Sequence, residues 1–174
     1  MKMSRTAIIL ILLITIGIIH IPVSYLEISH NREGIVFERK LIQLNDRITI
    51  RYIHSVMKTP VLEHYLIMPD GRLLLTDTEF MSYGAGLPEK NDYDFEITDK
   101  GFRVYNINKP FDFIVYRTAP VHTGADVTLV TEKIEVPFLS ISEERTPVRI
   151  VVKRVPGWIY LSREVGKWLM NKSR

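Results

Sequence analysis

Hydrophobic and polar residues alternate with a period of two along most of the chain beyond residue 35. The clearest case is Arg47–Ser55, in which Ile48, Ile50, Tyr52 and His54 fall on one face. Successive strand side chains point to opposite faces, so such segments predict half-buried β-strands. The other predicted strands are Val36–Leu41, Val61–Met68, Leu73–Phe80, Asp94–Thr98, Phe102–Tyr105, Phe111–Arg117, Val127–Thr131 and Val148–Arg154. Many short strands separated by turn residues predict an all-β fold, a small antiparallel β-sandwich or barrel.

The N-terminal segment has a different pattern, with no charged residue from Thr6 to Leu26. About 20 apolar residues suffice to cross a bilayer as a helix, so residues 1–26 are predicted to be a transmembrane anchor. Lys2 and Arg5 precede the run and predict a cytoplasmic N-terminus. The protein would then be a single-pass protein of the cell membrane, with an extracytoplasmic β-domain over residues 27–156. A cleaved signal peptide is the alternative, but Pro22–Tyr25 lacks a small-x-small cleavage site.

The C-terminal residues 157–174 return to a helical period. After Pro156-Gly157, one face carries five apolar residues and the other carries basic and polar ones. The apolar face consists of Trp158, Leu161, Val165, Trp168 and Leu169, and the opposite face of Arg163, Lys167 and Asn171. This predicts a basic amphipathic helix. Its apolar face would pack on the sheet, or it would lie on the membrane surface or on a partner.

Composition excludes several classes of protein. The 174 residues carry 23 basic and 20 acidic side chains, for a net charge of +3, which is too balanced for a nucleic-acid-binding face. The chain has no cysteine, so it has neither a disulfide framework nor a thiolate metal site. Five histidines without short ligand spacing give no metal signal, and we expect no cofactor.

The predicted strand pair 47–55 and 61–68 suggests a candidate site. If the two strands form a hairpin with Ile50 opposite Ile67, His54 faces Glu63 at the end of an apolar row. Such a pair serves as a ligand-binding or acid–base site, or it only fixes the register. Ser55 points to the opposite face from His54 and no Gly-x-Ser-x-Gly elbow occurs. Serine hydrolase chemistry is therefore disfavoured, and we expect no enzyme.

The loop Ser82–Pro88 departs from the alternating pattern. It places Gly84, Ala85 and Gly86 directly after a predicted strand. Glycine reaches positive φ without strain, so consecutive N–H groups here would form an anion-binding nest. The alternative is a tight corner between strands.

These pieces together resemble the family called domain of unknown function 1850. The resemblance rests on Ile53-His54-Ser55-Val56, Thr59-Pro60-Val61, Glu63-His64-Tyr65, Leu74-Leu75 and Tyr83-Gly84-Ala85-Gly86-Leu87-Pro88. It covers about Phe37–Pro88. The motif positions that it marks as a partner- or ligand-binding surface are His54, Ser55, Thr59, Pro60, Glu63, Tyr65, Tyr83, Gly84, Ala85, Gly86 and Pro88.

The resemblance implies a genomic association with tripartite ATP-independent periplasmic (TRAP) transporters of the type that uses TAXI-class solute receptors. It brings no chemistry with it. We therefore expect a membrane-anchored extracytoplasmic accessory protein that contacts the transporter's membrane subunit or solute receptor. The alternative is a small-ligand-binding or sensing β-domain, and a hydrolase is a distant third.

Overall fold

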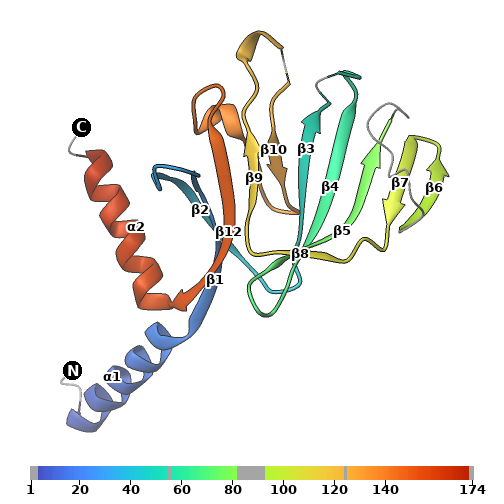
Figure 1. The fold of residues 1–174 in the computed structure, drawn as a ribbon. Coiled ribbons are helices and arrows are strands. Elements are labelled where there is room, and N and C mark those ends of the chain that lie inside the picture. The colour runs from blue at the N-terminus through green and yellow to red at the C-terminus, as the bar shows by residue number, and fades with distance from the viewer. Residues whose placement is uncertain (1–3, 55, 82–92, 124, 173–174) are drawn as a thin grey trace. The chain divides into compact units, whose positions relative to one another are not determined.

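The computed structural model describes residues 4–54, 56–81, 93–123 and 125–172 of the chain (Figure 1). Its helices and strands are, in chain order, α1 (Arg5–His20), β1 (Pro22–His30), β2 (Val36–Ile42), β3 (Arg47–Ile53), β4 (Pro60–Ile67), β5 (Leu73–Phe80), β6 (Asp94–Thr98), β7 (Gly101–Tyr105), β8 (Lys109–Phe111), β9 (Ile114–Arg117), β10 (Thr128–Val130), β11 (Glu135–Pro137), β12 (Pro147–Pro156) and α2 (Gly157–Lys172).

The chain divides into two compact units. The helical unit combines Met1–Ser24 with Lys153–Arg174, and the β unit is Tyr25–Val152. Both helices belong to the helical unit, and the strands belong to the β unit apart from the outer ends of β1 and β12. Within the helical unit, the N–H of Gly157 donates to the carbonyl of Ile21, 3.0 Å away. This bond links the start of α2 to the residue after α1.

The strands form two sheets. One has the order β2-β1-β12-β9, and the larger has the order β11-β10-β3-β4-β5-β7-β6, with β8 also paired to β5. Neighbours in the larger sheet run antiparallel, as do β12 and β9. The predicted all-β class and the predicted C-terminal helix are thus confirmed.

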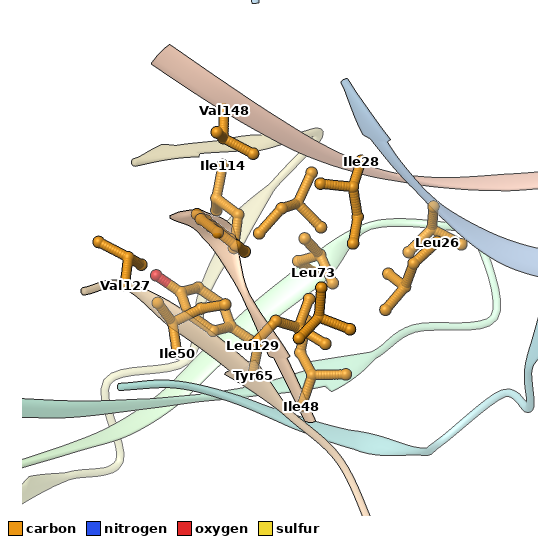
Figure 2. Packing of buried hydrophobic residues seen from close by; sticks show 14 of the residues in the cluster. Leu26, Ile28, Ile48, Ile50, Tyr65, Leu73, Ile114, Val127, Leu129 and Val148 are labelled. Atoms are coloured by element: carbon orange, nitrogen blue, oxygen red, sulfur yellow. The ribbon is translucent and has the colours of Figure 1, made fainter. Parts of the chain in front are cut away.

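One hydrophobic core joins the two sheets of the β unit (Figure 2). Ile28, Ile114 and Val148 come from the smaller sheet, and Ile50 and Leu129 from the larger one. Each is at most 6% exposed. Alternating apolar residues fill this space because every second strand side chain points inward.

The hairpin β3–β4 has a different register from the predicted one. Glu63 lies opposite Ile50, not opposite His54. The connecting loop is tighter than the sequence suggested, because the His54 N–H donates to the Thr59 carbonyl at 2.9 Å and Lys58 adopts a φ of +55°. The register differs by an even number of residues, so every side chain keeps its predicted face.

A β-bulge interrupts β5. His64 pairs with Asp77 while its neighbour Tyr65 pairs with Leu75, which leaves Thr76 as the extra residue. An extra residue exchanges the faces of the side chains that follow it. Leu75 therefore points with Tyr65 to the core, and Asp77 points with His64 to the outer face.

Two further predictions need correction. The predicted strand Phe111–Arg117 is two strands, β8 and β9, and the first of them begins at Lys109, before the predicted start. Strands β1 and β11 were not predicted. The predicted anchor takes in the first five residues of β1, Pro22–Leu26, because no charged residue interrupts the run before Glu27.

The apolar N-terminal run forms a shorter helix than predicted. Helix α1 ends at His20, and Pro22 opens β1, in which Tyr25 and Leu26 are fully buried. Proline does not continue a helix but is tolerated as the first residue of a strand. The predicted extension of the helix to Leu26 is therefore wrong. Within the described residues, no helix has both the length and the apolar character needed to cross a membrane.

Candidate functional site

The β unit contains a pocket of about 310 Å³ at the end of β3, β4 and β5. Its lining residues are Tyr52, His54, Val61, Glu63, Leu75, Thr78, Phe80, Tyr93, Val104, Ile107, Lys109 and Phe111. The walls are mostly aromatic and aliphatic, with a few polar groups among them. A pocket of this size suits a small ligand, since ligand pockets span roughly 300–1,000 Å³.

A carboxylate held by three phenols forms the polar part of this site. The Tyr52 hydroxyl donates to Glu63 Oε1 at 3.0 Å, and the Tyr65 hydroxyl donates to Oε2 at 2.7 Å. The Tyr116 hydroxyl also donates to Oε2. Tyr116 comes from β9 of the smaller sheet, whereas the other three residues come from the larger sheet. The cluster therefore links the two sheets by hydrogen bonds.

All three tyrosines remain protonated at neutral pH. Burial raises the pKa of Tyr52, Tyr65 and Tyr116 above the ordinary phenol value, and the negative charge of Glu63 raises it further. A protonated phenol donates one hydrogen bond. The three hydroxyls therefore orient the carboxylate and do not act as bases.

The hydrogen bonds leave one acceptor position on Glu63. A carboxylate oxygen accepts about two hydrogen bonds. Oε2 receives both Tyr65 and Tyr116, while Oε1 receives Tyr52 alone among the described residues. Glu63 also lines the pocket, so Oε1 can accept a hydrogen bond from a ligand there.

Lys109 gives the same pocket a positive charge. Its side chain is exposed, and Nζ lies 5.4 Å from the centre of the Phe111 ring. In the described part of the chain, no carboxylate forms an ion pair with it. The ammonium is therefore available to an anionic ligand group.

His54 lies where β3 turns into the hairpin loop. Its Nδ1 accepts the N–H groups of Val56 at 3.3 Å and Met57 at 3.2 Å. An Nδ1 that accepts hydrogen bonds carries no proton, so Nε2 bears the ring proton. His54 and Glu63 thus line one pocket without the direct cross-strand pairing that was predicted.

The outer face of the larger sheet carries a second polar cluster, centred on Asp77. Single ligand atoms of His64, Asp77 and Glu79 lie within 4.8 Å of one another. Asp77 already accepts hydrogen bonds from Arg47 at 2.9 Å and from Arg103 at 3.0 Å. A metal ion at this position would have to displace both guanidinium groups, so the arrangement fits an ion-pair network better than a metal centre.

The network shifts the pKa values of its members. Burial alone would raise the pKa of Asp77, but it is outweighed by the Thr76 hydrogen bond, the charge of His64 when His64 is protonated, the Arg47 charge and the Arg103 hydrogen bond, which lower the pKa. Burial, assisted by the Arg47 charge, lowers the pKa of His64. The His64 Nδ1 pairs with the Thr49 hydroxyl at 2.8 Å. The outer cluster is thus an anionic Asp77 beside an imidazole that burial and Arg47 hold neutral.

The structure places the predicted site residues unevenly. His54 and Glu63 line the pocket, and Tyr65 contacts Glu63 directly. Thr59 lies in the hairpin loop, where its hydroxyl is buried without a hydrogen-bond partner among the described residues. The predicted residues Ser55, Tyr83, Gly84, Ala85, Gly86 and Pro88 lie outside the residues that the structure describes.

Sequence reasoning missed Tyr116, Lys109 and the ligand-facing role of Tyr52. Tyr116 lies 53 positions from Glu63, and no local pattern connects two such residues. Lys109 lies outside every predicted strand, although in the structure it begins β8, which pairs with β5. Only Tyr52 carried a signal, because it shares the face of Ile50 and His54.

Comparison with known proteins gives a family and no close relative. No curated protein and no solved structure matches the chain. Residues 48–138 match the family described as domain of unknown function (DUF1850), and they include β4, all of β3 except Arg47, and the strands that carry Lys109 and Tyr116. The match covers just over half of the 174 residues. The chain belongs to the DUF1850 family.

Proposed function

We propose that the β unit binds a short organic acid that carries a hydroxyl or amino group. Among the described residues, Glu63 Oε1 keeps a free acceptor position, and the Lys109 ammonium in the same pocket forms no ion pair; this is the observation that supports the proposal most. A ligand hydroxyl or ammonium would donate to Oε1, and its carboxylate would pair with Lys109. The apolar walls and the small volume favour a short carbon chain.

The three phenols favour binding over catalysis. They fix the Glu63 carboxylate before the ligand arrives, so little side-chain entropy is lost on binding. A ligand that donates a hydrogen bond to Glu63 Oε1 then fills the acceptor position that the three tyrosines leave open.

The binding proposal predicts ligand-dependent thermal stabilisation. The purified chain would be screened with short hydroxy acids and amino acids, together with the matching acids that lack the hydroxyl or amino group. A ligand that binds the folded state raises the melting temperature. We expect a rise with the substituted acids and a smaller one with the unsubstituted acids. Equal rises would contradict the role of Glu63, and no rise with any acid would contradict the proposal.

The matched variants separate binding from folding. Lys109→Ala removes an exposed charge from the pocket, and Lys133→Ala removes one elsewhere on the β unit. We expect the first to abolish the ligand-dependent rise and the second to leave it unchanged, with both variants as stable as the parent. Glu63→Gln would lose binding too, but it also disturbs the tyrosine hydrogen bonds.

The family resemblance supports a role for the protein beside a transporter. In our proposal the protein is an extracytoplasmic accessory of a TRAP-type transporter of the TAXI class, and it works through contact with the membrane subunit or the solute receptor. Affinity purification of the tagged chain from native membranes tests this. Recovery of a transporter subunit would support the accessory role, and recovery of the chain alone would leave only the binding role.

A further inference from the structure

Helix α2 presents its apolar face outward. Its stripe of Trp158, Leu161, Val165, Trp168 and Leu169 is 47–59% exposed. By contrast, Ile159, Tyr160 and Gly166 elsewhere on the helix are half-buried. A helix of a soluble domain normally has the opposite arrangement, with the apolar stripe inward. An exposed stripe of this kind marks an interaction surface.

The charge of the helical unit limits what this surface binds. The segments Met1–Ser24 and Lys153–Arg174 contain eight Lys and Arg residues and one acidic residue, Glu164. The β unit contains the other fifteen basic and nineteen acidic residues. The net positive charge of the whole chain thus comes from the helical unit. Such an asymmetry indicates an anionic partner surface.

The residue types on α2 match a lipid surface. Tryptophan prefers the membrane–water interface, and interfacial helices combine Trp and Leu on one face with Lys and Arg around it. Trp158 lies near the start of α2, and Trp168 lies near its end, where Lys172 Nζ is 5.0 Å from its ring centre. Arg163 and Lys167 lie on the side away from the stripe. The stripe therefore has a tryptophan towards each end, with Lys172 beside the second of them, and the opposite side of the helix is basic.

Helix α1 also exposes apolar side chains. It belongs to the same compact unit and contacts α2. Ile8, Ile9, Leu10, Ile11 and Leu12 are each 46–60% exposed. Both contacting helices of the basic helical unit thus expose apolar side chains.

We propose that α2 lies on an anionic phospholipid bilayer with its Trp158–Leu169 stripe in the interfacial layer. The occupant is the lipid surface itself and not a partner protein. Charge attraction draws the basic unit to the bilayer, and burial of the five apolar side chains holds α2 there. This inference is independent of the ligand proposed for the β unit.

The chain provides its own reporter for this proposal. Its two tryptophans, Trp158 and Trp168, are both in α2, so intrinsic tryptophan fluorescence reports on this helix alone. The full chain would be reconstituted with vesicles of phosphatidylcholine, or of phosphatidylcholine with phosphatidylglycerol, with and without brominated acyl chains. We expect a blue-shifted emission that brominated lipid quenches, and stronger quenching in the anionic vesicles. The excess in anionic vesicles should fall as salt is added.

Two matched variants locate the effect. Leu161→Gln lies in the stripe, and Ser162→Gln is its exposed polar neighbour. Both keep the two tryptophans. We expect Leu161→Gln to weaken the partition of α2 by about tenfold, since a buried leucine contributes on that order, and Ser162→Gln to leave it unchanged. Circular dichroism would verify that both variants fold.

Three results would overturn the proposal. Blue-shifted emission without quenching by brominated lipid would mean that protein covers the stripe. Emission typical of water in vesicle-bound chain would mean that α2 stays in solvent. Equal quenching in both vesicle types would remove the anionic surface as the partner.

Discussion

The β unit and the helical unit use apolar residues in opposite ways. In the β unit, Ile48, Ile50 and Leu129 are completely buried, and the carboxylates of Glu63 and Asp77 have hydrogen-bond partners. In the helical unit, the stripe of α2 and much of α1 are exposed. Burial against its own chain therefore stabilises the β unit. The helical unit exposes apolar side chains that its own chain does not bury, and such a surface is available to a membrane or to another molecule.

The largest effect is expected from two substitutions that shorten an apolar side chain, one in each unit. Ile50→Ala removes a fully buried side chain from the core and should lower the free energy of unfolding by about 2–5 kcal/mol. Leu161→Ala removes a side chain that is 56% exposed and should change it by about 0.5 kcal/mol or less. Urea unfolding followed by circular dichroism measures both. Equal losses would mean that the α2 stripe is part of the protein's own core.

Substitution of one glycine in each unit extends the comparison to the backbone. Gly101 has a φ of +137°, and a Cβ there would lie 2.8 Å from Met81 Cα and closer still to the Phe80 carbonyl. Gly101→Ala should therefore destabilise the β unit by about 1–3 kcal/mol. Gly166 in α2 has no atom within 4 Å of an added Cβ, so Gly166→Ala should stabilise the helix by about 0.5–1 kcal/mol. Thermal unfolding compares the two, and a tolerated Gly101→Ala would contradict the strained backbone.

The charge network of the outer face gives a pH-dependent test. The pKa of Asp77 is lowered in the folded state. Its contribution to stability is thus complete above the unfolded-state pKa of Asp, about 3.9, and is lost as pH falls through the lower folded-state pKa. Asp77→Asn should cost about 1–3 kcal/mol at neutral pH, at the low end because both arginines are partly exposed.

Unfolding measured from neutral pH into the acid range should show the Asp77→Asn difference shrinking as the carboxylates protonate. Asp70→Asn is the control, because the ion pair of Asp70 with Arg72 is exposed. A difference that stays constant with pH would exclude an ionised Asp77 as its source.

The smallest expected effect concerns the tyrosine cluster. Tyr116→Phe removes one hydrogen bond to Glu63 and keeps the ring, so it should cost about 0.5–1.5 kcal/mol. Tyr105→Phe is the control, because the Tyr105 hydroxyl has no hydrogen bond among the described residues. If ligand binding survives in the Tyr116→Phe variant with reduced affinity, the phenols orient Glu63 as proposed. Unchanged stability would contradict the inter-sheet role of the cluster.

Much of the β unit could be predicted from the alternation of its residues. The even register difference in β3–β4 left Glu63 and His54 on the predicted face, although their pairing was wrong. The face on which a side chain lies depends only on whether its position along the strand is odd or even. The pairing of the two strands depends also on the geometry of the loop at Lys58. The bulge at Thr76 had no signal of its own, because nothing in the sequence of β5 marks an unpaired residue.

The candidate site was predictable only in the part that one hairpin supplies. Glu63, His54 and Tyr65 are close in sequence, so alternation and the family resemblance found them. Tyr116 and Lys109 reach the site from strands far along the chain. Their positions follow from which strands pair, and that choice depends on burial summed over both sheets.

The sequence by itself determined the strand class, the faces of the strand side chains and the amphipathic stripe of α2, because each follows from a local period of two or 3.6 residues. Pro22 marks where the helix in the apolar N-terminal run ends, but only the tertiary structure decided that the residues after it form a strand. The same run of aliphatic residues satisfies either conformation, and the core position that Leu26 occupies exists only once the two sheets pack. The same packing brought Tyr116 to Glu63, and no local rule connects them.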